Sequence, residues 1–386
     1  MRKFYTAEAV TEGHPDKLCD QIADAILDVC LKNDENSRVA CEVLATKGNI
    51  IVAGEITSAY EPDVFAVVRK VLSDVGYSSE GVTMDTFVHR QSPDIAEAVN
   101  ASKERRGGVS DNQIDWFQGA GDQGVMIGYA CDETKQLMPM PVVLANRIVR
   151  ELSACRQSSY IQGILPDGKA QVTVEYENGK PVRLDSVVVS CQHKEEKDLK
   201  KLEAEIRKKV LLPALRPLPP DEETKIYINP SGRFVCGGLD ADTGLTGRKL
   251  MVGSYGSMVP HGGGAFAGKD CSKVDRSAAY MARYIAKNIV AAGLASKCQV
   301  SLAYAIGVAQ PVMVQVDTFG TGNVCADDCL ELAIPLVFGL TPKQIVDTLR
   351  LTRPIFRQTA AFGHFGRKEF PWEHTDKAEA LRNAVI

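Results

Sequence analysis

A glycine-rich segment that ends in a lysine and an aspartate is the clearest candidate for chemistry in this sequence. Residues 262–270 read GGGAFAGKD, and the lysine is Lys269. Closely spaced glycines expose backbone N–H groups, and a neighbouring lysine neutralises the charge of phosphate. The segment therefore predicts contact with a phosphorylated ligand. The alternative is a plain glycine-rich turn ahead of a helix that begins near Lys273.

Two well-known nucleotide-binding patterns are only partly matched. From Gly263 the segment follows the phosphate-loop pattern GxxxxGK[ST], but Asp270 stands where a hydroxyl would meet the magnesium ion, and residues 257–261 do not read as a strand leading into the loop. Residues 119–124 (GAGDQG) match the dinucleotide pattern GxGxxG, but they follow a loop and no helix obviously begins there. A phosphate-loop ATPase or kinase and a Rossmann site are therefore both disfavoured.

Charges and glycines meet again in two other segments. Residues 232–249 contain Arg233, Arg248 and Lys249, and arginine offers phosphate a planar fork while lysine offers a compact charge. This density predicts a site for polyphosphate and metal, with a solvated hairpin as the alternative. Residues 13–17 (GHPDK) precede a predicted helix, whose start attracts anions. Asp16 in that segment is either a ligand for a hard cation such as Mg²⁺ or only a helix cap.

Motifs for a protein nucleophile are not evident. The sequence shows no GxSxG motif, no catalytic Cys/His arrangement and no zinc-binding spacing, so hydrolysis through a protein nucleophile has little support. A phosphate-rich site without an obvious base suits phosphoryl transfer by positioning and charge stabilisation. It equally suits displacement by a nucleophile that has no proton to lose.

The elements that must position these residues follow from hydrophobic periodicity and turn residues. Hairpin-linked strands recur three times with helices between them, which favours an α+β fold with antiparallel or mixed sheets. The polar residues 92–118 suit a mobile loop and the proline-rich residues 213–223 an interdomain connector, and a plain surface linker is the alternative for both. Helices are predicted over residues 16–32, 62–75, 194–212, 273–292 and near 325–332, and strands over 38–45, 50–57, 170–176, 182–191, 300–307 and 311–317.

Composition and charge exclude several classes of protein. Of 386 residues, 45% are hydrophobic and 24% charged, which is typical of a globular chain of two or three domains rather than a disordered or fibrous one. The net charge of −4 gives no reason to expect nucleic acid or a membrane as a partner. The N-terminus lacks a signal-peptide core, and polar residues interrupt the longest uncharged stretch, 298–316. With eleven scattered cysteines interpreted as free thiols, we expect a cytoplasmic protein.

Taken together, these segments resemble S-adenosylmethionine synthetase (methionine adenosyltransferase) over essentially the whole chain. The resemblance implies the reaction of ATP, L-methionine and water to S-adenosylmethionine, phosphate and diphosphate. The methionine sulfur would attack C5′ of ATP, and the enzyme would then hydrolyse the expelled triphosphate. The motifs that carry the resemblance are residues 13–17 (GHPDK), 119–124 (GAGDQG), 244–249 (GLTGRK), 261–268 (HGGGAFAG), 274–280 (VDRSAAY) and 363–367 (GHFGR).

The same resemblance implies roles for individual residues. His14 would lie beside the oxygen that joins C5′ to the triphosphate. Asp16 and Asp275 would hold two magnesium ions, and Glu42 an activating potassium ion. The residues implied to act in catalysis are His14, Lys169, Arg248 and Lys269. Those implied to bind ATP are His14, Asp167, Gly168, Lys169, Arg233, Phe234, Asp242, Arg248, Lys249, Ala265 and Lys269, and those implied to bind methionine or the phosphates are Glu55, Gln91, Asp242 and Lys273.

The architecture implied by the resemblance is three similar α/β units with pseudo-threefold symmetry and active sites at a dimer interface. The chain would then work as a homodimer or a dimer of dimers. The implied segments are an N-terminal domain at 1–100, a central domain at 113–231, a C-terminal domain at 232–372 and a mobile gating loop at 92–118.

Some positions depart from the family pattern, which leaves a second class of function open. Residues 237–242 read GGLDAD in place of GGPxGD, Gly253 stands where an aspartate is common, and residues 257–260 differ from the usual ones. A catalytically silent regulatory subunit is the competing hypothesis. Retention of His14, Asp16, Lys269 and Asp275 argues against it, because a silent subunit has no chemical need for them.

Overall fold

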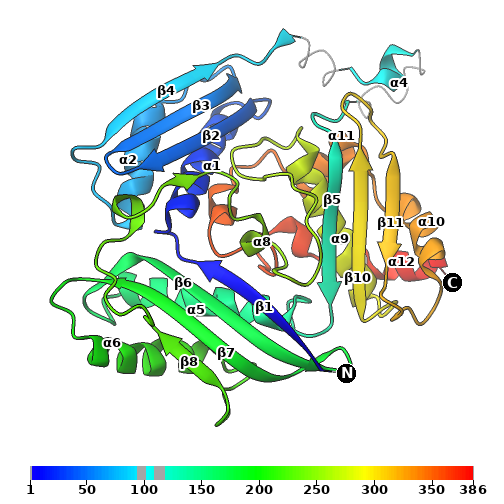
Figure 1. The fold of residues 1–386 in the computed structure, drawn as a ribbon. Coiled ribbons are helices and arrows are strands. Elements are labelled where there is room, and N and C mark those ends of the chain that lie inside the picture. Colours follow the sequence, from blue (N-terminus) through cyan, green and yellow to red (C-terminus); the bar gives the residue numbers. More distant parts are fainter. Residues whose placement is uncertain (1, 94–100, 108–117, 386) are drawn as a thin grey trace.

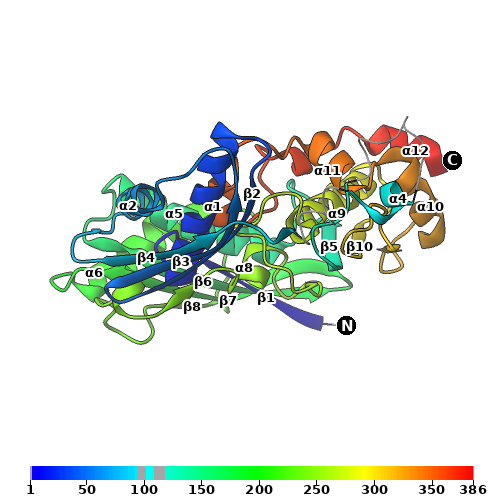
Figure 2. The ribbon, with the colours of Figure 1, turned by 90° about the horizontal axis from the view of Figure 1, so that it is seen from above.

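The computed structural model describes residues 2–93, 101–107 and 118–385. Its strands form three sheets, two of four strands and one of three. Helices pack against one face of each sheet, as the two views in Figure 1 and Figure 2 show. The predicted α+β class with mixed and antiparallel sheets is confirmed.

The first sheet has the strand order β4-β3-β2-β9. β2 and β3 form an antiparallel hairpin, and β4 runs parallel to β3. Leu18, Ile22 and Ile26 recur every fourth residue along α1 and are fully buried, so this helix covers the inner face of the sheet. The elements are β2 (Arg38–Thr46), β3 (Asn49–Thr57), β4 (Thr83–His89), β9 (Gly244–Leu245), α1 (Pro15–Asn33) and α2 (Val64–Val75).

The second sheet has the order β1-β6-β7-β8. Its long hairpin, β6 and β7, turns at Asn178 and Gly179, which both adopt positive φ as tight hairpin turns require. The elements are β1 (Arg2–Val10), β6 (Ile164–Glu177), β7 (Lys180–His193), β8 (Lys225–Ile228), α5 (Met140–Gln157), α6 (Leu199–Ile206) and α7 (Leu212–Ala214).

The third sheet has the order β11-β10-β5 and packs against α9, whose residues 274–290 are all buried. Within the described ranges no single helix is long and apolar enough to cross a membrane, and α10 with α11 reaches that length only as a pair bent by 76°. The elements are β5 (Gly124–Cys131), β10 (Lys297–Tyr304), β11 (Met313–Asp317), α9 (Val274–Ala291), α10 (Asp327–Val337), α11 (Pro342–Leu349) and α12 (Ala378–Val385).

The three units exchange strands, so no sheet is built from one contiguous stretch of chain. β1 pairs with β6 over nine residue pairs, although residues 1–100 otherwise build the first sheet. β5 pairs with β10 in the third sheet, and β9 adds to β2 in the first. This exchange brings segments that are far apart in sequence to the junction of the three units (Figure 1).

Most predicted elements are confirmed, and two need correction. The predicted helix 194–212 starts only at Leu199, where the Asp198 side chain accepts a hydrogen bond from the Lys201 N–H, and it passes through a π-helical turn, Arg207–Leu211. The predicted interdomain connector 213–223 is wrong. It leads from α7 to β8, which pairs with β7 in the same sheet. The predicted mobile loop 92–118 lies largely outside the described residues.

Replacing Arg276 with methionine is expected to lower the free energy of unfolding by about 3–5 kcal/mol, because Asp24 would be left as an unpaired buried charge. Both side chains are fully buried, and Nη2 of Arg276 lies 2.6 Å from Oδ2 of Asp24. Urea unfolding would measure the loss. As the control, Lys343→Met breaks the exposed Lys343–Asp347 pair and should change stability by less than about 0.5 kcal/mol. Equal losses in the two variants would contradict the prediction.

Candidate active site

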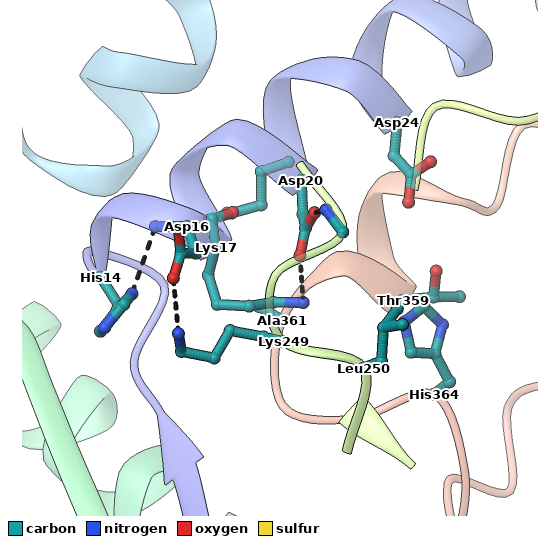
Figure 3. A network of polar contacts seen from close by, with 12 residues as sticks. His14, Asp16, Lys17, Asp20, Asp24, Lys249, Leu250, Thr359, Ala361 and His364 are labelled. Carbon is teal, nitrogen blue, oxygen red and sulfur yellow. Dashed lines mark hydrogen bonds and ion pairs between the residues drawn. The ribbon is translucent and has the colours of Figure 1, made fainter. Parts of the chain in front are cut away.

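The N-terminus of α1 is where Asp16 meets Lys249. His14 caps this helix: its Nδ1 accepts a hydrogen bond from the Asp16 N–H at 3.2 Å. Asp16 is buried, its Oδ2 lies 2.5 Å from Nζ of Lys249, and its Oδ1 accepts the Leu245 N–H at 3.0 Å (Figure 3). The helix-cap alternative for Asp16 is therefore wrong. The cap is the His14 ring, and Asp16 bonds a segment 229 residues away.

The short strand β9 carries that distant segment to α1. A Cβ on Gly244 would overlap the carbonyl of Pro15, so only glycine allows this approach. The approach places Nε of Arg248 3.4 Å from Oδ1 of Asp16. The alternative of a solvated hairpin for this segment is wrong, because β9 pairs with β2 at the edge of the first sheet.

Opposite charges and burial set the ionisation of Asp16 and His14. Burial favours the neutral form of Asp16, but hydrogen bonds from Lys249 and the Leu245 N–H, together with the charges of Lys249 and Arg248, outweigh it and hold the pKa of Asp16 below its ordinary value. Burial and the charge of Lys249 lower the pKa of His14 to about 4, so the ring is neutral near pH 7. Because Nδ1 accepts the Asp16 N–H, the ring proton lies on Nε2, which is free to donate.

β6 supplies the next residues. Strand pairing places Lys169 beside the end of β1, and its Nζ lies 2.9 Å from Oε2 of Glu8. Asp167 is buried and accepts the Gly238 N–H at 2.8 Å, and burial raises the pKa of Asp167. Gly168 accepts a hydrogen bond from the Thr11 N–H, which ties β6 to the chain just before α1. We call the charged group around this point the helix-start cluster: His14, Asp16, Lys169, Arg248 and Lys249.

The other residues predicted to bind ATP lie on three further segments. The Phe234 N–H donates to the ring of His193 at the end of β7, and Arg233 pairs with Glu195. Arg233 and Asp242 are exposed, and Phe234 is half-buried. The Asp242 N–H donates to the Gly238 carbonyl, and the Gly238 N–H donates to Asp167, which links Asp242 to β6. Ala265 lies against Gly247, so the glycine-rich loop borders the helix-start cluster.

A second charged group forms at the start of α9, and we call it the glycine-loop cluster: Asp122, Lys269 and Asp275. Lys269 pairs with Asp275 in the first turn of α9, and its Nζ lies 3.8 Å from Oδ2 of Asp122. Close packing around the loop requires glycine at two of its positions. A Cβ on Gly264 would overlap the Asp275 carboxylate, and one on Gly262 would overlap the backbone of β5.

The carboxylate of Asp122 disfavours the charge of its neighbour Asp275. Burial raises the pKa of Asp275, the neighbouring Asp122 raises it further, and the Lys269 ammonium only partly offsets them. Asp275 is therefore a carboxylate that gains from an added cation.

Lys273, predicted to bind phosphate, is held elsewhere. It is buried and pairs with Asp270, whose Oδ2 also accepts the Val39 N–H at 2.7 Å. Asp270 therefore fastens the glycine-rich loop to β2. The phosphate-loop alternative is excluded by the same observations, because residues 257–261 form no strand and Asp270 is engaged in this packing.

The residues predicted to bind potassium and methionine lie on the first sheet, away from α1. Strand pairing places Glu55 opposite Ala40, two residues before Glu42, so both glutamates share one face. That face is turned away from the core. Glu42 is exposed, whereas Val43, whose side chain points to the opposite face of β2, is buried. Glu42 accepts a hydrogen bond from Thr246, and the Gln91 N–H donates to Thr57 at the end of β3.

The structure thus places most of the predicted residues in three regions of one chain: the helix-start cluster, the glycine-loop cluster and the outward face of the first sheet. Lys273, Arg233 and Phe234 lie outside them. Among the described residues, no hydrogen bond or ion pair joins the helix-start cluster to the glycine-loop cluster. Sequence reasoning missed Asp122 as a site residue, although it lies inside the GAGDQG motif. It also missed Asp20, which accepts the Gly247 N–H just before Arg248 and whose only signal was its spacing of four residues from Asp16.

The carboxylates suit magnesium as shared rather than enclosed ligands. In the part of the chain that the structure describes, no group of three or more His, Cys, Asp or Glu side chains is placed to hold a metal ion. Magnesium commonly takes one or two protein carboxylates and completes its shell with water and substrate phosphates. Asp16 and Asp275 fit this use, because each is a buried carboxylate beside a lysine at the start of a helix.

Fold and candidate site together define an α+β protein in which lysines, arginines and isolated carboxylates gather at two helix starts, and such side chains suit a phosphate-rich substrate. Family models agree along nearly the whole chain: the N-terminal domain of S-adenosylmethionine synthetase matches residues 2–99, the central domain 117–234 and the C-terminal domain 236–374. The chain belongs to the S-adenosylmethionine synthetase family. Its activity is that of a methionine adenosyltransferase, which converts ATP, L-methionine and water to S-adenosylmethionine, phosphate and diphosphate.

Proposed function

We propose that two copies of this chain build each active site, with the helix-start cluster of one copy facing the glycine-loop cluster of the other. The observation that supports this is that, among the described residues, no hydrogen bond or ion pair joins the two clusters on one chain, although each has a carboxylate held by a lysine. A triphosphate needs cations along its whole length, and neither cluster supplies them all. Joined across a two-fold axis, the clusters would provide Lys169, Arg248, Lys249 and Lys269 to one triphosphate.

The open face of the first sheet supports a second copy as the partner. Leu44, Phe87 and Leu245 are 37%, 64% and 38% exposed, and strand pairing places them on the face that also carries Glu42. An apolar face of this kind on a sheet is typical of an interface between subunits. We therefore propose a homodimer, with a dimer of dimers as the larger form it allows.

In the proposed mechanism no side chain acts as a base, because the methionine sulfur carries no proton. The sulfur attacks C5′ of ATP with its lone pair, and the bond from C5′ to the triphosphate oxygen breaks. His14, neutral and protonated on Nε2, donates a hydrogen bond to that oxygen as negative charge develops there. Lysines and Arg248 stabilise the departing triphosphate, which is the largest electrostatic demand of the reaction.

Metal ions would add to this stabilisation, and the residues present suit them. Asp16 and Asp275 would hold two magnesium ions, which would supply positive charge to offset that of the triphosphate. Glu42 would hold potassium. Glu55, Gln91 and Asp242 would orient methionine, and Arg233, Phe234 and Ala265 would contact the nucleoside. Asp167 and Gly168 would border the ATP, and Lys273 would reach the phosphates only after leaving Asp270.

Three further proposals rest on the sequence and on single observations. A cytoplasmic location is supported by the eleven cysteines, all of which are free thiols. Residues 92–118 would act as the gating loop. Their described part includes α4 (Lys103–Arg106), which docks on residues 307–310 through Lys103 and Glu104. The domain limits 1–100, 113–231 and 232–372 would mark units of sequence, while the sheets share strands across them.

The composite site predicts recovery of activity when two inactive variants are mixed. Asp16→Asn damages the helix-start cluster and Lys269→Ala the glycine-loop cluster. In a dimer of one Asp16→Asn chain and one Lys269→Ala chain, one site carries both changes and the other carries neither. The purified mixed dimer should therefore show about half of native activity, and an equal mixture with free subunit exchange about a quarter. Coexpression of differently tagged chains, purification of the mixed dimer and assay of S-adenosylmethionine would measure it.

The matched control changes the same cluster twice. In a mixed dimer of Asp16→Asn and Lys249→Ala chains, every site carries one change in its helix-start cluster, so no recovery is expected. A purified mixed dimer of Asp16→Asn and Lys269→Ala that stays as inactive as the control would show that the site lies within one chain.

A further inference from the structure

Aspartates recur every fourth residue along one face of α1, at 16, 20, 24 and 28. Figure 3 shows the first three following one another along the helix. Each accepts a backbone N–H from a distant segment: Leu245 for Asp16, Gly247 for Asp20, Gly268 for Asp24, and Phe356 with Arg357 for Asp28. α1 is therefore a scaffold to which the loops of the site are fastened, and not only a core helix.

Asp20 holds the phosphate-binding segment most directly. Its Oδ1 accepts the Gly247 N–H at 2.9 Å, immediately before Arg248 and Lys249. Its Oδ2 lies 2.8 Å from Nζ of Lys17, and both side chains are 5% exposed. A buried hydrogen bond of this kind fixes the backbone from which the two cations project.

Asp16 cannot serve this purpose while the enzyme works. Asp16 binds the Leu245 N–H and the Lys249 ammonium. In the proposed mechanism Asp16 binds magnesium and Lys249 binds phosphate once triphosphate is present, so the contact between Asp16 and Lys249 would be lost. Asp20 has no such competing demand, because its one cation is the buried Lys17. The anchor at Gly247 can therefore persist when the contacts of Asp16 change.

The residues around Asp20 and the Gly247 loop are tightly packed. A Cβ on Gly247 would crowd Ala265, and the residue has a φ of +76°, so the loop can turn here only with glycine. The cavity beside Asp20 measures about 10 Å³, room for one water molecule, and it is lined partly by Lys17, Phe266 and His364. Displacing the loop would open this packed corner to solvent.

We propose that Asp20, neutralised by Lys17, is a positioning residue that holds Gly247 and so aligns Arg248 and Lys249 on the triphosphate. The inference rests on the proposed function of those two cations. Asp20 does not touch substrate; it acts through the backbone of the loop.

Two double variants separate the hydrogen bond from the ion pair. Lys17→Met with Asp20→Asn removes both charges but keeps a side-chain oxygen for the Gly247 N–H. Lys17→Met with Asp20→Leu keeps a similar shape but has no acceptor. Binding of inorganic tripolyphosphate, measured by calorimetry with Mg²⁺, should stay within about threefold of native in the first and weaken by about tenfold or more in the second. KM for ATP should rise in parallel in the second.

A control at the far end of the same helix tests whether any lost aspartate has this effect. Asp28→Leu removes the acceptor of the Phe356 and Arg357 N–H groups, so it should lower the melting temperature while tripolyphosphate affinity stays within about threefold of native. If Lys17→Met with Asp20→Leu fails to fold, Asp20→Glu replaces it. That variant keeps the charge, displaces the oxygen by one methylene and should weaken tripolyphosphate binding by about threefold or more.

Each outcome decides the matter. Equal affinity in the asparagine and leucine double variants, or native affinity in Asp20→Glu, would overturn the inference. So would an equal loss in Asp28→Leu. Native protein that forms S-adenosylmethionine but binds no tripolyphosphate would overturn the proposed role of Arg248 and Lys249, and with it this inference, while leaving the activity intact.

Discussion

Lys269→Ala is expected to lower kcat by about 10²–10³-fold, the range seen when one preorganised donor to a developing negative charge is removed. Lys269 is the cation of the glycine-loop cluster, and the triphosphate it would face gains charge as the C5′ bond breaks. Its removal also leaves Asp275 without its ion-pair partner. Steady-state kinetics with saturating methionine would measure the loss.

The same variant should change the pH dependence of the reaction. Burial and Asp122 already raise the pKa of Asp275, and loss of the Lys269 ammonium should raise it further. Asp275 would then stay protonated to higher pH, so magnesium binding and activity should recover as pH rises. The acidic limb of the kcat/KM profile should move toward higher pH than in the native enzyme.

The control for Lys269 is Lys287→Met, which removes a buried lysine on α9 from its partner Glu373. This variant should be less stable while kcat stays within about threefold of native, since Lys287 lies outside the site. A loss of kcat/KM below about threefold in Lys269→Ala would show that Lys269 is peripheral.

Asp16→Asn is expected to raise the magnesium concentration needed for half-maximal activity by at least about a hundredfold, because even outer-shell partners of metal ligands often cost ten- to a hundredfold. The amide keeps the shape of the carboxylate and can still accept the Leu245 N–H, so the fold should persist. Lys249 loses its charged partner, which leaves its ammonium free for phosphate.

A magnesium titration of activity tests this prediction, with Asp28→Asn as the matched change on the same helix. Asp28 contacts the backbone of Phe356 and Arg357 rather than the site, so its magnesium requirement should equal that of the native enzyme. Unchanged turnover of Asp16→Asn at limiting magnesium would remove Asp16 from the set of ligands.

The elements could be predicted because their causes are local. Apolar residues recur every three or four positions in α1 and α9, and alternating β-branched runs mark β2, β3, β6 and β7. The helix start predicted at residue 194 was wrong, because charge and helix propensity do not show where a helix is capped. The structure places the cap at Asp198. The prediction of an interdomain connector at residues 213–223 was wrong for a related reason: prolines indicate an irregular segment but not which elements it connects.

The residue types alone define the chemistry that is available: lysines and arginines for phosphate, isolated carboxylates for a divalent cation, glycines where the chain must turn or approach closely, and the family motifs in their order. Which of these residues meet depends on the fold. Asp16 and Lys249 are 233 residues apart, and Asp20 and Gly247 are 227 apart. Such pairings depend on the exchange of β1, β5 and β9 between sheets and on glycines that permit close backbone contact, and neither leaves a signal in local propensity.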